Sequence, residues 1–176
     1  IGGYVYGVTT GREWFCQSSA IMRKDILDEC QIDPSTIKTY QDLTDVYAKV
    51  KEKHPDMVMM ASNNSTTPDT KYEMVDTLTD GFGVLMNQGQ ETTVENYYAT
   101  DEYKEFVETM YDWQQKGYLS KDVATTTEAV ENQVKAGAAF SYFAPNKPGY
   151  DTRAELLCGT EMAIAPLSEP WAGTAQ

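Results

Sequence analysis

The chain has 176 residues, 41% of them hydrophobic, and a formal net charge of −13, which is the size and composition of one folded globular domain. Its fourteen lysines and arginines are scattered and form no basic stripe. A field of that sign repels phosphate groups, so the charge argues against nucleic-acid partners and against direct binding to a membrane surface, although solubility alone also explains it.

The first third of the sequence predicts several short strands. Residues 4–8 (YVYGV) and 18–22 (SSAIM) have strand-like side chains, and the second run leads into one or two helical turns at 23–30. Residues 57–61 (MVMMA) are continuously apolar, which is typical of a short strand covered on both faces.

A helix is predicted between two of these strands. It begins after Thr39, because Thr39 and Asp42 have the spacing of a capping box, and Pro55 ends it. One face is expected to be buried, since four apolar residues repeat at helical spacing: Leu43, Val46, Tyr47 and Val50.

The middle of the chain predicts a helix at about 72–79, then a strand and turn at 81–90. The strongest helical pattern follows at 101–118. Thr100 can cap this helix, Gly117 can end it, and Trp113 within it is expected to pack in the core.

The last part of the chain predicts one more helix and two strands. Thr125 and Glu128 have the spacing of a second capping box, ahead of a helix that Gly137 ends. Residues 138–143 predict a buried strand that stops before Pro145, and 161–167 predict a final strand. Strands that alternate with helices predict an α/β layer structure.

Motifs of common enzymes are missing from the sequence. It contains no G-x-G-x-x-G, Walker loop, G-x-S-x-G or H-E-x-x-H, although its many carboxylates leave a glycosidase-like pair open. Cys16, Cys30 and Cys158 lie far apart, so one disulfide or ordinary thiols are both possible, and the single histidine disfavours a zinc site. We expect no catalytic residue, no metal and no cofactor.

Two strand ends instead carry side chains that are suited to binding a ligand. The strands at 57–61 and 138–143 are each followed by a loop of amide, hydroxyl, aromatic or lysine side chains. In open α/β sheets, ligands lie beyond the carboxyl ends of strands. Amides and hydroxyls hydrogen-bond a neutral polyol, and an aromatic ring stacks on its C–H face.

Four blocks in order resemble a known family. They are 4–8; 20–56, with KDIL at 24–27 and TYQDL at 39–43; 112–149; and 159–170. Together they resemble the second lobe of a bacterial extracellular solute-binding protein, the receptor of an ABC importer, of the sugar-binding type that includes maltose-binding protein. The stretch around residue 33 looks most like lipoprotein receptors of Gram-positive gut bacteria.

The resemblance implies a fold, a set of partners and a location. It implies an α/β periplasmic-binding-protein-like (type II) lobe with a central sheet flanked by helices, one of two lobes that close on a ligand. Residues 1–176 would form this single C-terminal-type lobe, with 1–8 and 168–176 near the hinge between lobes. The implied partners are a carbohydrate solute, the permease subunits and the first lobe of the same chain. The implied location is extracellular, as a membrane-anchored lipoprotein or a periplasmic protein.

The resemblance also implies ligand-binding residues, which lie in the first loop, after the strand at 57–61, around the end of the strand at 138–143, and near the last strand. The sequence departs from maltose-binding protein because no tryptophan directly follows the strand at 138–143. The matching positions are Arg12, Glu13, Trp14, Asn63, Asn64, Tyr142, Phe143, Asn146, Lys147 and Trp171.

Several of these residues also have a purely structural interpretation. Trp14 can pack in the core or against the other lobe, and Arg12 can form a surface ion pair. Asn63 and Asn64 can satisfy their own turn through Asx hydrogen bonds.

The residues at 142–147 have structural alternatives as well. Because strand side chains alternate, one of Tyr142 and Phe143 is expected in the core. Asn146 and Lys147 would be held at the mouth of a cleft by flanking prolines, or would form an ordinary rigid surface turn.

Three functions follow from these patterns. The first is a non-catalytic receptor lobe that binds a sugar or oligosaccharide for import. The second is a carbohydrate-active enzyme domain, which requires two facing carboxylates. The third is a sensor or adhesion domain of the same fold.

Overall fold

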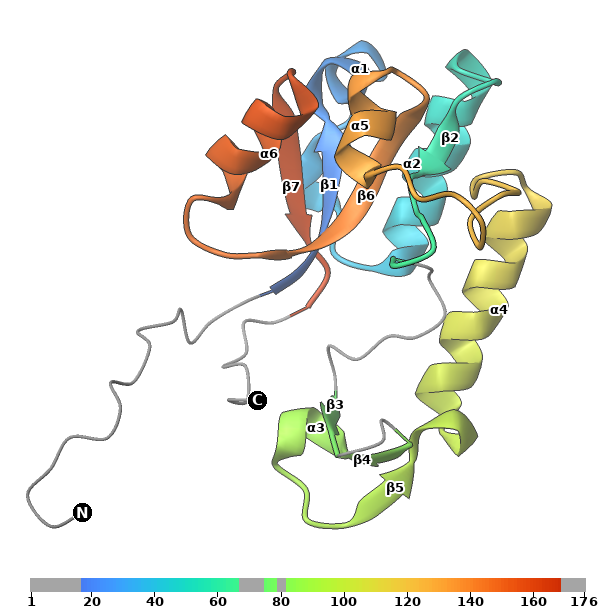
Figure 1. Cartoon of the computed structure of the whole chain (residues 1–176), viewed down its shortest axis with the longest axis vertical. Coiled ribbons are helices and arrows are strands. Elements are labelled where there is room, and N and C mark those ends of the chain that lie inside the picture. Colours follow the sequence, from blue (N-terminus) through green and yellow to red (C-terminus); the bar gives the residue numbers. More distant parts are fainter. Residues whose placement is uncertain (1–16, 67–74, 79–81, 169–176) are drawn as a thin grey trace, which may run out of the picture.

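The centre of the molecule is a four-stranded sheet with strand order β2-β6-β1-β7 (Figure 1). The computed structural model describes residues 17–66, 75–78 and 82–168. Strand β1 is antiparallel to both of its neighbours, and β2 is parallel to β6. The strands are β1 (Gln17–Arg23), β2 (Val58–Met60), β6 (Ala139–Asn146) and β7 (Met162–Pro166).

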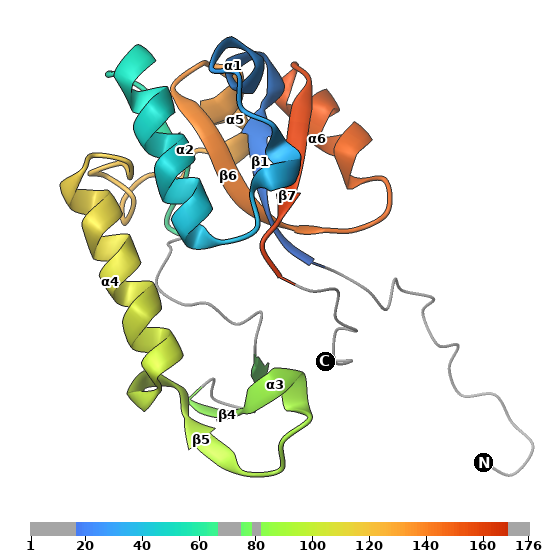
Figure 2. The same ribbon diagram turned by 180° about the vertical axis from the view of Figure 1, so that it is seen from behind.

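Helices cover both faces of this sheet. Figure 1 looks onto the face covered by α5 (Val130–Lys135) and α6 (Tyr150–Cys158), and Figure 2 looks onto the face covered by α2 (Tyr40–Lys53). Two separate apolar clusters fill the two sides: one contains residues of α1 (Lys24–Glu29) and α2, the other residues of α5 and α6. The predicted α/β lobe with a central sheet flanked by helices is confirmed.

A second, smaller sheet lies at the far end of a long helix. Strands β3 (Val75–Thr77), β4 (Gly83–Leu85) and β5 (Val94–Asn96) pair antiparallel in that order. A single turn of helix, α3 (Met86–Gly89), follows β4. Helix α4 (Asp101–Gln115) then runs back toward the main sheet (Figure 1).

The helix predicted at about 72–79 is wrong where the structure describes it. Val75–Thr77 is a strand whose Asp76 and Thr77 pair with Leu85 and Val84. Val and Thr are β-branched, which suits a strand, and the partner strand lies too far along the sequence for helical periodicity to reveal it.

Helix starts were predicted with mixed success. The Thr39–Asp42 capping box of α2 is confirmed, since each side chain receives a hydrogen bond from the other residue's backbone N–H. Thr100 caps α4, as expected. The second box is wrong: α5 begins at Val130 without a side-chain cap, and the Thr125 hydroxyl donates to the Asp122 carbonyl in a turn.

A buried hydrogen-bond chain fixes α2 and β2 on β6. The Ser141 hydroxyl donates to the Met59 carbonyl at 2.7 Å and lies 2.8 Å from the Tyr47 hydroxyl. Because a serine has only one hydroxyl proton, Tyr47 is the donor in the second bond. Both side chains are fully buried, and this burial raises the pKa of Tyr47 above its ordinary value.

Trp113 joins α4 to the same layer, as expected. Its ring is fully buried, 4.9 Å from the Tyr47 ring, and its indole N–H donates to the Thr44 hydroxyl at 2.8 Å. The buried tryptophan therefore connects α4 to α2 through both packing and a satisfied hydrogen bond.

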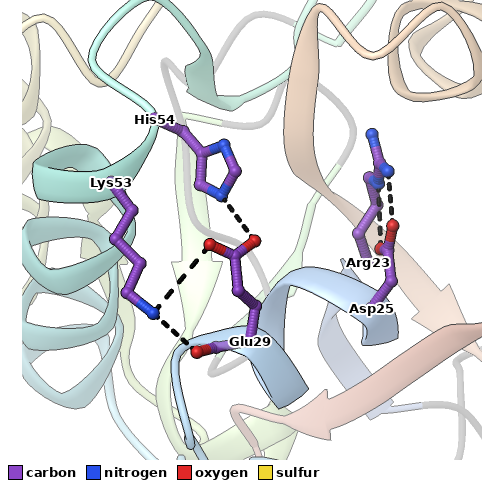
Figure 3. Close-up of polar contacts among 5 residues, drawn as sticks. All are labelled: Arg23, Asp25, Glu29, Lys53 and His54. Carbon is purple, nitrogen blue, oxygen red and sulfur yellow. Dashed lines mark hydrogen bonds and ion pairs between the residues drawn. The ribbon is translucent and has the colours of Figure 1, made fainter.

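Polar contacts between the end of α1 and the end of α2 hold these helices together (Figure 3). The Lys53 ammonium donates to the Glu29 carbonyl at 2.6 Å, and a Glu29 carboxylate oxygen lies 3.1 Å from the His54 ring nitrogen Nε2. Arg23 donates two hydrogen bonds to Asp25, which lower the pKa of that carboxyl. These contacts lie on the surface, so we expect them to add little to stability.

We expect Ser141→Ala to destabilise the fold more than Tyr47→Phe. Tyr47→Phe removes one hydrogen bond, a loss of about 1 kcal/mol, whereas Ser141→Ala leaves a buried hydroxyl and a buried carbonyl without partners, a loss of about 2 to 3 kcal/mol. Equilibrium unfolding in urea measures both. Tyr111→Phe, at an exposed tyrosine of α4, is the matched control and should leave the free energy of unfolding unchanged. Equal losses for Ser141→Ala and Tyr47→Phe would contradict the donor assignment.

Candidate ligand-binding site

One edge of the main sheet gathers the ends of three strands. Strand β6 is parallel to β2, and β6 and β7 are both antiparallel to β1, so the carboxyl ends of β2, β6 and β7 lie at the same edge as the start of β1. The small sheet lies beyond this edge in both views (Figures 1 and 2). This is the edge at which ligands of open α/β sheets bind.

Asn63 shapes the turn that follows β2. Its side-chain oxygen accepts hydrogen bonds from the backbone N–H groups of Ser65 at 2.9 Å and Thr66 at 3.0 Å. Its amide nitrogen donates to the Glu128 carbonyl at 3.0 Å. With 9% of its surface exposed, Asn63 forms the Asx turn that the sequence left as an alternative, and it ties that turn to the segment before α5.

Asn64 follows Asn63 in this turn, and its side chain is exposed. Its backbone N–H donates to the Thr126 carbonyl at 2.9 Å, and its side-chain oxygen accepts a hydrogen bond from the Ser65 hydroxyl at 3.3 Å. The turn is therefore fixed by backbone bonds and by Asn63, and it presents the Asn64 amide to solvent at the strand-end edge.

Strand β6 is longer than expected. The predicted stop before Pro145 is wrong, because the strand continues to Asn146, with Pro145 opposite Ser18 and Asn146 opposite Gln17. The neighbour β2 pairs with β6 only as far as Ser141, so beyond that point β6 is an edge strand. On that open side β6 has no partner strand, so the missing N–H of proline breaks no hydrogen bond of the sheet.

Asn146 and Lys147 lie where the strand ends. Asn146 is half-buried, whereas Lys147 is exposed in the turn that leads to α6. Gly149, at φ +79°, makes this turn before Tyr150 begins the helix. Because β2 and β6 are parallel, Asn64 and Lys147 both follow carboxyl ends at one edge. The structure thus brings the amides of Asn64 and Asn146 and the ammonium of Lys147 to the same strand-end edge of the sheet.

Tyr142 and Phe143 point to opposite faces of β6, as the alternation predicts. Phe143 is half-buried with its ring 5.6 Å from Tyr40 and 6.2 Å from Trp113. Tyr142 is 1% exposed in the cluster with α5 and α6, and burial raises its pKa well above the ordinary range. Its hydroxyl has no hydrogen-bond partner among the described residues. Both rings are packed, and their role toward a ligand stays a prediction.

A polar contact that the sequence reasoning missed joins the first and last strands. The Gln17 side chain donates to the Ser168 carbonyl at 3.2 Å, and the Ser18 N–H donates to the Ser168 hydroxyl at 3.0 Å. Gln17 also lies opposite Asn146. The available signal was position: Gln17 lies at the start of β1 and Ser168 lies just after β7, both at the candidate edge.

Four of the predicted site positions cannot be placed. Arg12, Glu13, Trp14 and Trp171 lie outside the described residues, as do 1–8 and 169–176 of the predicted hinge segments.

Within 17–66, 75–78 and 82–168, no three His, Cys, Asp or Glu side chains are grouped to hold a metal ion. Cys30 and Cys158 are free thiols whose pKa values burial raises. No described helix has the length and apolar character to cross a membrane.

Comparison with known proteins gives the fold a family context. No protein-family model matches the chain. It is 26% identical over 134 residues to a carbohydrate ABC transporter substrate-binding protein of Streptococcus pneumoniae. The aligned residues cover 76% of this chain and 27% of that protein. Among solved structures, it is similar to the N-glycan transport solute-binding protein NgtS of S. pneumoniae in complex with Man1GlcNAc, with a TM-score of 0.80 and 23% identity over 98% of this chain and 38% of NgtS.

The fold is that of extracellular solute-binding proteins. A family 1 extracellular solute-binding protein from Alicyclobacillus acidocaldarius matches with a TM-score of 0.60 and 12% identity, over 96% of this chain and 41% of that one. The resemblance drawn from the sequence is confirmed at the level of this solute-binding protein fold. The chain spans 27% of the length of the curated relative that it matches.

We expect Asn63 and Asn64 to differ sharply in their effect on stability. Asn63→Ala removes the acceptor of two backbone bonds and the donor to Glu128, a loss of about 1 to 3 kcal/mol. Asn64→Ala alters an exposed side chain and should change the free energy of unfolding by less than about 0.5 kcal/mol. Urea unfolding, together with proteolysis of the turn, measures the difference. Equal effects of the two substitutions would show that Asn63 does not hold the turn.

Proposed function

We propose that this chain is one lobe of an extracellular solute-binding protein that delivers a sugar or oligosaccharide to an ABC importer and performs no catalysis. The observation that carries the proposal is the match of 98% of the chain to NgtS in a complex with Man1GlcNAc. A second NgtS structure, in complex with Man5GlcNAc, matches 96% of the chain with a TM-score of 0.78. The curated relative is named for carbohydrate transport.

The path of the chain supports a lobe that is inserted between hinge segments. Residues 1–176 form this lobe, and the first lobe of the same protein is its partner. The start of β1 and the end of β7 meet through the Gln17–Ser168 and Ser18–Ser168 bonds, so the polypeptide enters and leaves at one point of the candidate edge. Segments 1–8 and 168–176 then lead to the hinge, about which the two lobes close on a ligand.

The groups at the strand-end edge suit a neutral polar ligand. Asn64, Asn146 and Lys147 offer hydrogen-bond donors and amide acceptors without a cluster of positive charge. A net charge of −13 opposes the approach of an anion. Arg12, Glu13, Trp14 and Trp171 are proposed to complete this half of the site with a stacking ring and further polar groups.

The remaining assignments follow from this role. The partners are the permease subunits of the importer, and the location is extracellular, as a lipoprotein or in the periplasm. The relatives are substrate-binding proteins, which supports a receptor over an enzyme. A hydrolysis assay on the sugars that bind tests the enzymatic alternative, and product formation would favour it.

We expect the complete two-lobe protein to bind at least one sugar in calorimetry. The panel takes its compounds from the ligands of similar proteins: Man1GlcNAc, Man5GlcNAc, tagatose, mannitol and β-1,6-galactobiose. If the protein binds none of these sugars and no other neutral oligosaccharide, the proposed function is refuted.

We expect Asn146→Ala and Lys147→Ala each to weaken that binding about tenfold, because each removes a hydrogen bond worth about 1.4 kcal/mol in a closed site. Lys49→Ala removes the same charge from the exposed face of α2 and serves as the control. If Lys147→Ala and Lys49→Ala have equal effects, the turn after β6 does not contact the ligand.

A further inference from the structure

A cluster of aromatic rings lies at the small sheet and the start of α4. It consists of Phe82, Tyr97, Tyr98 and Tyr103, and we call it the aromatic cluster. Tyr97 is 2% exposed and belongs to the core of the small sheet with Val84. Phe82 and Tyr98, in contrast, are 51% and 45% exposed, with ring centroids 5.8 Å apart. Two large rings thus lie side by side at the surface.

The Tyr98 ring is held in place by Tyr97 and Tyr103. The Tyr98 ring packs edge-on against Tyr103 at 5.0 Å and against Tyr97 at 5.6 Å. The backbone is fixed as well, because the Tyr97 N–H donates to the Phe82 carbonyl at 3.0 Å and the Tyr98 N–H to the Asn96 side chain at 3.2 Å. A ligand that stacks on fixed rings loses little conformational entropy in ordering them.

The aromatic cluster belongs to the unit that lies beyond the candidate edge of the main sheet. The small sheet lies beyond the edge where β2 and β6 end, in both views of the molecule (Figures 1 and 2). Helix α4 connects the two units, with Thr100 capping its start beside the aromatic cluster and Trp113 buried in the main core at its other end. A helix of 15 residues with both ends anchored is a rigid connection.

The chemistry around the rings favours a neutral sugar. The flat faces of aromatic rings take up the C–H faces of pyranoses, and the exposed carboxylates of Glu95, Asp101 and Glu102 in the same segment accept hydrogen bonds from hydroxyl groups. The same carboxylates repel an anionic ligand or an acidic peptide.

We propose that Phe82 and Tyr98 form a second sugar-binding platform, which stacks against distal units of an oligosaccharide whose first unit binds at the strand-end edge. This inference rests on the proposed function and deepens it, because it makes the preferred ligand an oligosaccharide rather than a monosaccharide. The platform contributes affinity only to ligands long enough to reach from one sheet to the other.

The test compares long and short ligands in the complete two-lobe protein. From the calorimetric panel, extended with longer oligosaccharides, one takes the longest and the shortest sugars that the unmodified protein binds. We expect Phe82→Leu and Tyr98→Leu each to weaken binding of the long ligand about fivefold to tenfold and to leave the short one within about twofold, since a stacked ring contributes about 1 kcal/mol. Phe82→Tyr keeps the ring and should retain the affinity.

Two controls separate stacking from structural damage. Tyr111→Leu removes an exposed ring from α4 outside the aromatic cluster and should change neither affinity. A thermal unfolding curve identifies a variant that has lost its fold, and Phe82, which is the more exposed ring, then gives the decisive comparison.

The possible results distinguish this inference from the proposed function. Loss of affinity for the long ligand alone supports the platform. Equal binding of long and short ligands by the leucine variants and the unmodified protein overturns the platform and leaves the receptor function standing, as does a protein that binds only monosaccharides. Unchanged sugar affinity with impaired sugar transport by the permease also overturns it, because the rings would then face a protein. Failure to bind any sugar overturns both.

Discussion

The hydroxyl of Ser141 is the point at which the layers of the main sheet are fixed to one another. It donates to the β2 backbone and accepts from Tyr47 of α2, inside a core where an unpaired polar group is expensive. The need to pair this hydroxyl sets the register of β2 on β6 and the position of α2 over both strands. The parallel register in turn decides that the turn at Asn63 and the turn at Lys147 emerge at the same edge. The position of the candidate site is therefore a consequence of buried packing several residues away from it.

The second consequence of the topology concerns the path of the chain. Because β1 lies between β6 and β7 and is antiparallel to both, the strand that enters the sheet begins where the last strand ends. The contacts of Ser168 with Gln17 and Ser18 bind these two points together. A lobe attached through such a junction can rotate as a rigid body, because the bending occurs outside the sheet. The strand-end edge, where the proposed ligand groups lie, is therefore also the edge closest to the proposed hinge.

Features governed by local physics could be predicted from the sequence, and features governed by distant partners could not. The cap at Thr39 and the buried face of α2 depend on residues a few positions apart, so their patterns were visible. The strand at Val75–Thr77 depends on pairing with β4, and the continuation of β6 through Pro145 depends on how far β2 reaches. At the site, Asn63 was predicted with two alternative roles, and only its hydrogen bond to the Glu128 carbonyl shows that it fixes the turn after β2 to the segment before α5. The aromatic cluster was missed because its exposed rings, Phe82 and Tyr98, are separated in sequence by β4, α3 and β5.

Two kinds of contact on one lobe also bear on how a receptor of this design would close and release its ligand. In the proposed receptor, hydrogen bonds at the strand-end edge and stacking on the exposed rings would both be made to a single lobe, so both would exist in the open and in the closed form. A ligand shifts a hinge only by the difference in its affinity for the two forms. Closure would therefore be driven by the contacts that the first lobe adds, while the groups of this lobe are suited to first capture of the ligand.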